Sequence, residues 1–286
     1  MAARFVVVPA WQGSGSSRAM RLIDGAEAIR GDLPAAATTV VEIPAGAGES
    51  LETGVHRFSS IAVIVEATDA ALREVSAGIG GSVDGPSGNV PIVIGGDCGV
   101  EFAAVRHALA SAPQTALVWF DAHGDLNTPE SSPSGAFHGM VVRTLLGDGP
   151  PGLAPAPVID PSRVVFAGTR ALDDAEAEYL EAGGLAVLSP AELADPQGLV
   201  DAVRATGATS VYLHVDLDVL DPSEIDGVAF PEPFGVTTAQ LTAAIRALRE
   251  QFPLAGAGIT EFAPSAPEAS VDDLPAILRI VSALVR

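Results

Sequence analysis

The chain has 286 residues and a formal net charge of −21 at pH 7, from 15 basic and 36 acidic residues. This charge argues against nucleic acid or an anionic membrane as a partner and favours a small cationic ligand. Every basic residue other than histidine is arginine, so the absence of lysine excludes a Schiff-base or Walker-type lysine mechanism.

The first half of the chain alternates short apolar runs with helical segments. Strands are expected at 4–8, 38–43, 89–94 and 115–120, and helices at 18–30, 60–77 and 100–110. The run at 115–120 is apolar throughout, as expected for a strand buried on both faces. Gly95 and Gly96 follow the strand at 89–94, where they would let the backbone turn sharply and approach a ligand.

The second half continues this alternation. A polar loop at 128–135, long enough to bind a substrate, leads to a helix at 137–146. Further strands are expected at 163–167, 185–188, 210–218 and 257–262, and helices at 175–182, 195–206, 237–250 and 272–285. Strands that alternate with helices predict an α/β fold with a parallel sheet covered on both faces. No repeat or linker divides the chain, so residues 1–286 are predicted to form a single domain.

The composition also indicates the cellular compartment in which the protein is expected. Hydrophobic residues make up 48% of the chain, which suits a large core, but no apolar run approaches the ~18 residues of a membrane span. The apolar run before Pro9 is too short for a secretory signal. Cys98 is the only cysteine, which excludes an intramolecular disulfide and fits a reducing compartment. We expect a cytoplasmic protein with no nucleic-acid or membrane partner.

A first group of potential metal ligands follows the strand at 115–120. If the strand runs on through the sequence DAHGDLN, then Asp121, His123 and Asp125 lie at i, i+2 and i+4 and share one face. Burying such carboxylates costs several kcal/mol for each unpaired charge, so cations are expected to offset the cost.

A second group has the same pattern. His214, Asp216 and Asp218 alternate along the strand at 210–218, which ends before Pro222. For one such group, solvated aspartates in a turn are an equal alternative. Two groups with the same strand-and-ligand pattern favour a metal site.

Cys98 follows the strand at 89–94 and is therefore expected at the same edge of the sheet. In open α/β sheets, ligands bind beyond the carboxyl ends of the strands. The alternative is an inert buried cysteine, because free cysteines commonly lie in the core.

Six motifs occur in order along most of the chain: GGDC at 95–98, DAHGDLNTP at 121–129, SGAFHGM at 134–140, GTRALD at 168–173, HVDLDVLDP at 214–222 and GITEFAP at 258–264. Together they resemble the arginase/agmatinase superfamily of ureohydrolases. The resemblance implies a three-layer α/β/α fold with a central, mostly parallel sheet of about eight strands. It also implies two Mn²⁺ ions at the carboxyl edge of that sheet.

The resemblance assigns a role to most of the polar residues in these motifs. It implies a metal-ligand set of Cys98, Asp121, His123, Asp125, Asp216 and Asp218, in which Asp121 and Asp216 bridge the two ions. It implies that His138 shuttles a proton and that Glu261 holds the substrate guanidinium. Asn127 and Ser134 match positions that contact the α-carboxylate in arginases, and Asp173 matches one near the α-amino group. Asp173 also fits a simple acidic start of the following helix.

Three departures from the family pattern affect the substrate and the metal. Cys98 stands where the family has a histidine ligand, and a softer thiolate can admit Zn²⁺, Fe²⁺ or Co²⁺, weaken the site or leave it unbound. His214 replaces a serine that is usual in arginases, so we expect it to compensate for Cys98, as a ligand or as the partner of a ligand. Ala136 stands where arginases have an asparagine for the α-carboxylate, and the loop at 228–233 replaces the usual glycine-rich loop.

The chemistry of these residues agrees with the implied roles. A pair of divalent ions lowers the pKa of a shared water, which supplies a hydroxide to attack a guanidinium carbon. Oxygen and imidazole ligands suit Mn²⁺. We therefore predict a metal-dependent hydrolase that cleaves a guanidino C–N bond of L-arginine or of a derivative such as Nω-hydroxy-L-arginine, releasing urea or hydroxyurea.

Two alternatives remain open from the sequence. One is an agmatinase or another guanidino- or formimino-acid hydrolase, and the other is a catalytically silent metal-binding subunit, suggested by Cys98. Trimers or hexamers are usual in the resembled family, so a homo-oligomer is expected.

Overall fold

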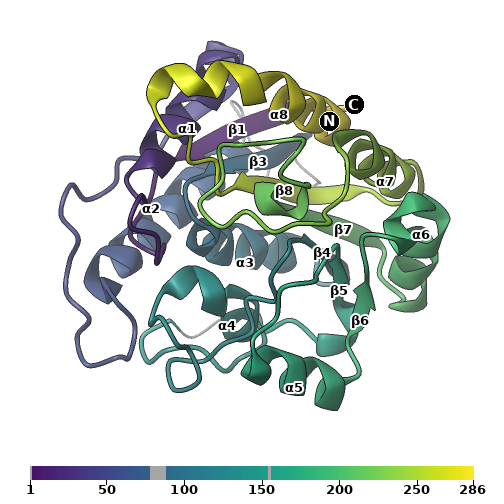
Figure 1. Cartoon of the computed structure of the whole chain (residues 1–286), viewed down its shortest axis with the longest axis horizontal. Coiled ribbons are helices and arrows are strands. Elements are labelled where there is room, and N and C mark those ends of the chain that lie inside the picture. The colour runs from purple at the N-terminus through teal and green to yellow at the C-terminus, as the bar shows by residue number, and fades with distance from the viewer. Residues whose placement is uncertain (1, 78–87, 154–155) are drawn as a thin grey trace.

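The protein is described by a computed structural model that covers residues 2–77, 88–153 and 156–286. Eight parallel strands form one sheet in the order β2-β1-β3-β8-β7-β4-β5-β6 (Figure 1). The strands are β1 (Ala2–Val8), β2 (Thr38–Val40), β3 (Asn89–Gly95), β4 (Thr115–Phe120), β5 (Val164–Ala167), β6 (Ala186–Leu188), β7 (Ser210–Asp216) and β8 (Leu254–Thr260). The predicted α/β class and eight-stranded sheet are confirmed.

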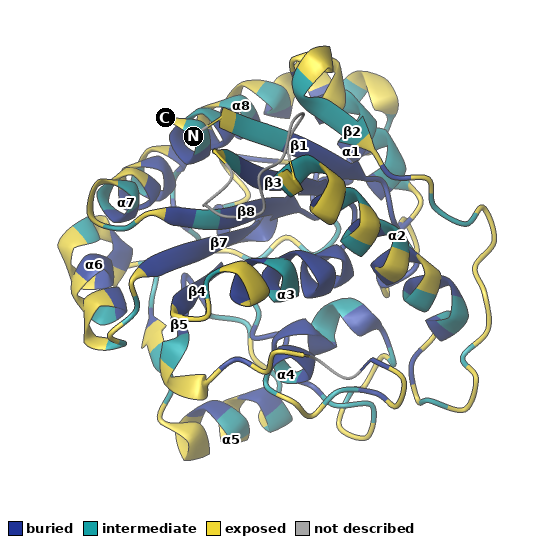
Figure 2. Cartoon of the chain, turned by 180° about the vertical axis from the view of Figure 1, so that it is seen from behind, coloured by how far each residue is buried: buried dark blue, intermediate teal, exposed yellow. Residues whose placement is uncertain are grey.

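Helices cover both faces of the sheet. One face carries α1 (Arg21–Gly31), α6 (Pro196–Ala205), α7 (Thr238–Gln251) and α8 (Ser270–Val285), and the other carries α2 (Phe58–Ala77), α3 (Glu101–Ser111), α4 (Val141–Leu145) and α5 (Asp174–Gly183). The central strands are buried between these layers (Figure 2). The three-layer arrangement is therefore the expected one. No helix in the described ranges is long and apolar enough to cross a membrane.

The central strand β4 shows how the sequence builds this sandwich. Val118 and Phe120 enter the hydrophobic cluster beneath α6, α7 and α8, while Leu117 and Trp119 enter the cluster beneath α2, α3 and α4. Successive side chains of a strand point to opposite faces, so a strand buried on both sides must be apolar throughout. Trp119 pairs in register with His214 on β7, and both side chains therefore lie on the α3 side.

The expectation that β4 continues through the DAHGDLN motif is wrong. The strand ends at Phe120, because the carboxylate of Asp121 accepts a hydrogen bond from the backbone N–H of His123 (2.6 Å) and turns the chain. Asp125 then has a left-handed backbone conformation, with φ of 51°. The second ligand strand likewise ends at Asp216, whose carboxylate accepts from the Asp218 N–H (2.8 Å).

Most other boundaries differ from the prediction by a few residues, and three of the differences lie near the pocket or change an element. The helix expected at 137–146 is a 3₁₀ turn, Phe137–Met140, followed by the short helix α4. The strand expected at 38–43 contains only Thr38–Val40. The last strand ends at Thr260, because Glu261 takes a left-handed conformation with φ of 65°.

Candidate metal centre and substrate pocket

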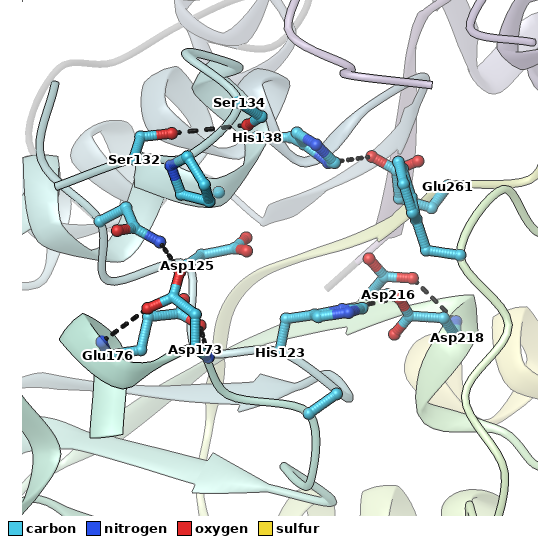
Figure 3. Close-up of a pocket in the computed structure, with 15 residues that line it drawn as sticks. His123, Asp125, Ser132, Ser134, His138, Asp173, Glu176, Asp216, Asp218 and Glu261 are labelled. Carbon is cyan, nitrogen blue, oxygen red and sulfur yellow. Dashed lines mark hydrogen bonds and ion pairs between the residues drawn. The ribbon is translucent and has the colours of Figure 1, made fainter. Parts of the chain in front are cut away.

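A pocket of about 200 Å³ opens at the carboxyl edge of the sheet, where the loops after β4, β5, β7 and β8 meet (Figure 3). It is lined by His123, Asp125, Asn127, Ser132, Pro133, Ser134, His138, Gly139, Ala171, Asp173, Glu176, Asp216, Asp218, Phe230 and Glu261. Nine of the twelve candidate residues from the sequence are in this set. The other three, Cys98, Asp121 and His214, are buried beneath it.

Asp121, His123 and Asp218 form what we call the open group. The Nδ1 atom of His123 lies 3.0 Å from a carboxylate oxygen of Asp218 and 3.4 Å from one of Asp121. The His123 side chain is 30% exposed and faces the pocket. A backbone N–H from Ala122 donates to the second oxygen of Asp218 (3.1 Å), which fixes that carboxylate.

Cys98, Asp121 and His214 form what we call the buried group. Their potential ligand atoms all lie within 4.8 Å of one another. The Cys98 Sγ atom is 3.7 Å from His214 Nε2, and His214 Nε2 is 3.8 Å from a carboxylate oxygen of Asp121. Asp216 adjoins this group, with an oxygen 3.2 Å from Cys98 Sγ. Asp121 is thus shared by the two groups.

The carboxylates of the centre titrate abnormally. Burial, together with neighbouring carboxylates, raises the pKa of Asp125 and Asp216 well above their usual range and that of Asp218 to about 6. Burial acts in the same direction on Asp121, but His123 and His214 outweigh it and lower its pKa. Packing so many acidic groups together is unfavourable unless cations or protons balance them.

The donor set fits divalent cations. One oxygen of Asp125 and one of Glu261 are buried without a hydrogen-bond partner in the described part of the chain. Buried polar atoms are normally satisfied, so these oxygens indicate missing partners. Carboxylate and imidazole donors suit Mn²⁺ at the open group. In the described residues a third cluster of mutually close ligand atoms contains Cys98, Asp216 and Glu261. Asp125 faces the same pocket but belongs to none of the three clusters.

His138 and Glu261 lie on one side of the pocket, with their side chains pointing toward each other (Figure 3). The Nδ1 atom of His138 is 3.3 Å from a Glu261 oxygen, and its Nε2 atom accepts a hydrogen bond from the Gly15 N–H (3.3 Å). This arrangement assigns the ring proton to Nδ1. Burial acts to lower the pKa of His138, but Glu261 outweighs it and raises the pKa above its usual value. The Phe230 ring covers His138, with centroids 5.4 Å apart.

Asn127, Ser134 and Asp173 also line the pocket, and Ser134 lies beside His138 (Figure 3). The Asn127 amide donates to Asp173 (2.7 Å), and the Ser134 hydroxyl oxygen accepts from the Ala136 N–H (3.2 Å). Asp173 also caps α5 through a reciprocal pair of hydrogen bonds with Glu176. Both readings of Asp173 therefore agree with its position, since one carboxylate starts a helix and lines the pocket.

Three residues near the centre were missed from the sequence. Glu176 lines the pocket and accepts from the Leu126 N–H (3.1 Å), and its spacing from Asp173 is the capping-box signature. Glu101 is a fully buried carboxylate on α3, detectable only as one acidic residue at the start of an apolar helix. Phe230 belongs to the loop at 228–233, which carries no recognisable motif.

Arg170 is structural. Its guanidinium donates to backbone carbonyls of two segments after β7, among them those of Asp218 (2.8 Å) and Glu232 (2.8 Å). His107, which lies outside the motifs, forms a hydrogen bond with Ser76 (2.8 Å) on the neighbouring helix.

Comparison with known proteins gives a consistent result. A family model described as "Arginase family" matches residues 5–283. The arginase of Bacillus caldovelox is 32% identical over 234 residues, covering 78% of this chain and 76% of that protein. The N(omega)-hydroxy-L-arginine amidinohydrolase of Streptomyces lavendulae is 31% identical over 198 residues, 68% of each chain. The solved structure of the B. caldovelox arginase has a TM-score of 0.80 at 25% identity and covers 98% of both chains.

Proposed function

Because the chain belongs to the arginase family, we propose that it hydrolyses the terminal guanidino group of L-arginine or of a derivative such as Nω-hydroxy-L-arginine. The chain is a hydrolase of C–N bonds in linear amidines. The products of the proposed reaction are urea, or hydroxyurea, and an amine such as ornithine. One observation carries this proposal: the acidic centre and the His138–Glu261 pair face the same pocket.

In this proposal two divalent ions, Mn²⁺ at least at the open group, are held by the carboxylate centre. The proposed ligands are Cys98, Asp121, His123, Asp125, Asp216 and Asp218. The ions would supply a hydroxide at neutral pH and neutralise the buried negative charge.

The chain's own residues orient the substrate and move a proton. Glu261 offers carboxylate oxygens to the N–H groups of a guanidinium, which holds its carbon toward Asp121 and Asp216. His138 holds its proton on Nδ1, the atom nearest Glu261, and can deliver it to a departing amine. The Gly15 N–H keeps the ring in this orientation through Nε2. Phe230 excludes water from one side of the pair.

Three polar residues that line the pocket favour an amino-acid substrate. Asn127 and Ser134 offer neutral polar groups for an α-carboxylate, and Asp173 offers a carboxylate for an α-amino group. Agmatine lacks the carboxylate that the first two residues would bind. The net charge of −21 would favour the approach of a cationic substrate. A reducing cytoplasm suits the single thiol, and a trimer or hexamer is proposed by family resemblance.

Release of urea and hydroxyurea tests the function. The protein would be loaded with Mn²⁺ and offered L-arginine, Nω-hydroxy-L-arginine, agmatine and guanidino or formimino acids, with bound metal counted per chain. We expect turnover of an amino-acid substrate with both metal positions filled. Preference for agmatine or a formimino acid would replace the proposed substrate. Full metal loading without turnover of any of them would favour a silent metal-binding subunit.

A further inference from the structure

Beneath the pocket, the buried group continues into a second set of polar residues that substrate binding does not use. Glu101 from α3 lies against His214 and also contacts Tyr212 from β7, and all three side chains are buried. A charged carboxylate in an apolar layer is costly unless it has partners of its own. Glu101 has two, Tyr212 and His214.

The contacts of Glu101 indicate which ring nitrogen of His214 has a lone pair available for a metal. The Tyr212 hydroxyl donates to Glu101 Oε2 (2.8 Å), and His214 Nδ1 lies 3.4 Å from the same oxygen, at ion-pair distance but outside hydrogen-bond geometry. Glu101 is the acceptor nearest Nδ1, which favours the ring proton on that nitrogen. The lone pair of Nε2 then faces Cys98 and Asp121, whose ligand atoms are 3.7 and 3.8 Å away.

The ring of His214 is also held by stacking against one of its faces. It stacks on Trp119 with centroids 3.5 Å apart and planes inclined by 18°. The Trp119 Nε1–H donates to Asp121 (3.0 Å), so the same indole fixes a second member of the buried group. Opposite the stack, Gly258 leaves space for Glu101, because a Cβ there would overlap the carboxylate.

We propose that Cys98, His214 and Asp121 form a metal subsite in which His214 Nε2 is a direct ligand and which takes a borderline cation such as Zn²⁺ in preference to Mn²⁺. This inference rests on the metal centre of the proposed function. A carboxylate that holds the distal N–H of an imidazole is the usual support of a metal-binding histidine. Thiolate, imidazole and carboxylate together are typical zinc donors, whereas Mn²⁺ prefers oxygen and imidazole.

Cys98, His214 and Glu101, taken in this order, also resemble a thiol nucleophile, its base and an orienting acid. Cys98 is only 1% exposed and is not among the residues that line the pocket, so a substrate carbon does not reach its sulfur. The geometry therefore favours a ligand over a nucleophile.

Metal binding to the whole chain tests the proposal without relying on activity. Apo-protein would be titrated with Mn²⁺, Zn²⁺ and Co²⁺, with ions counted per chain and the cobalt form examined by absorption and proton NMR. Most sites with nitrogen, oxygen or sulfur donors favour Zn²⁺ to some degree, so we expect the buried position to prefer Zn²⁺ over Mn²⁺ by a larger factor than the open position does. The buried position should also show a sulfur-to-cobalt charge-transfer band. The buried Nδ1–H of His214 should appear as a slowly exchanging, hyperfine-shifted resonance.

Variants show whether His214 binds the metal or only packs beside it. His214→Ser should lose that resonance and bind Zn²⁺ at this position at least ~100-fold more weakly, while Glu101→Gln should weaken it by roughly 10–100-fold. His107→Ser, at the partly buried histidine away from the centre, should change neither quantity. Unchanged zinc affinity and an unchanged cobalt spectrum in His214→Ser would overturn the proposal.

Two further results keep this test independent of folding and of the proposed function. If His214→Ser does not fold, the wild-type cobalt spectrum decides, since absence of both the thiolate band and the shifted N–H resonance excludes this subsite. If a covalent intermediate between substrate and Cys98 were trapped, Cys98 would be a nucleophile and the proposal that it is a metal ligand would be overturned. Zinc binding as described without release of urea or hydroxyurea would retain the subsite and reject only the substrate.

Discussion

The open and buried groups share Asp121 yet differ in almost every other property. The open group uses His123, which is 30% exposed and faces the pocket. The buried group uses His214, which is fully buried, stacked on Trp119 and backed by Glu101. One side of the acidic centre is thus accessible to substrate and solvent, and the other is built into the core.

This difference follows from where each ligand lies in the fold. His123 follows β4 in a turn, so its ring can reach the pocket, while His214 is within β7 and pairs in register with Trp119. A ligand inside a strand is held by sheet packing on both sides, and a ligand in a loop is held by a few hydrogen bonds. The buried group is therefore expected to define metal identity and the open group to serve the reaction.

The largest effect is expected from Asp121→Asn, because Asp121 is the residue that both groups share. The substitution removes a negative charge that His123 and His214 both contact. We expect loss of both bound ions and a fall in kcat/KM on the order of 10⁴-fold, or roughly 5 kcal/mol of transition-state stabilisation. Metal counting and urea release measure this, with the exposed Asp160→Asn as control. Retention of one tightly bound ion would show that the groups are separate sites.

The next effect concerns His138, which belongs to neither group. His138→Asn should leave metal content unchanged but lower kcat on the order of 10³-fold, because the proton carried on Nδ1 is lost. His56→Asn is the matched control, since this exposed histidine adjoins the same loop through its backbone N–H (2.8 Å to the Gly135 carbonyl). Loss of metal in His138→Asn would mean that the ring supports the centre rather than the proton transfer.

The sequence predicted the open group better than the buried group. Strand-end motifs reveal Asp121 and Asp218, because the carboxyl ends of parallel strands meet at one edge of the sheet. The match of whole motifs added His138 and Glu261. The exact ligand geometry was not predictable, because side-chain hydrogen bonds at Asp121 and Asp216 end the strands earlier than the alternation of side chains suggests.

Glu101 illustrates what one sequence does not reveal. It is 157 residues from Gly258, taking the difference of the two residue numbers, yet its carboxylate occupies the space that this glycine leaves. Its partners Tyr212 and His214 alternate on β7, but nothing local indicates that α3 places an acid opposite them. The sequence did indicate that His214 lies close to the altered ligand Cys98, because both strands were predicted to end at the same edge of the sheet.

Alkylation of Cys98 would test how deeply the buried group is enclosed. Burial, and then Asp216, raise the pKa of this thiol well above its usual value, which lowers its thiolate fraction. With an opening free energy of about 3 kcal/mol or more, iodoacetamide should modify the folded protein at least ~100-fold more slowly than the unfolded chain. The rate of mass increase gives the measurement, and Cys98→Ser gives the background. Rapid modification of the folded protein would show that solvent reaches the buried group.

The smallest effect is expected at Asp173. Substitutions there distinguish its role as the N-cap of α5 from a role in substrate binding. Asp173→Ala removes the N-cap of α5 and should destabilise the protein by about 1 kcal/mol. Asp173→Asn keeps a capping oxygen, so it should retain most of this stability while raising KM for an amino-acid substrate.

Asp174→Ala is the matched control for this pair, because Asp174 is an exposed residue in the first turn of the same helix. Thermal unfolding should show little change for Asp174→Ala, and KM should remain that of the wild type. If Asp173→Asn leaves KM unchanged, the carboxylate serves α5 alone. The α-amino group of the substrate would then be bound elsewhere in the pocket, and Asn127, which donates to Asp173, would be the next residue to vary.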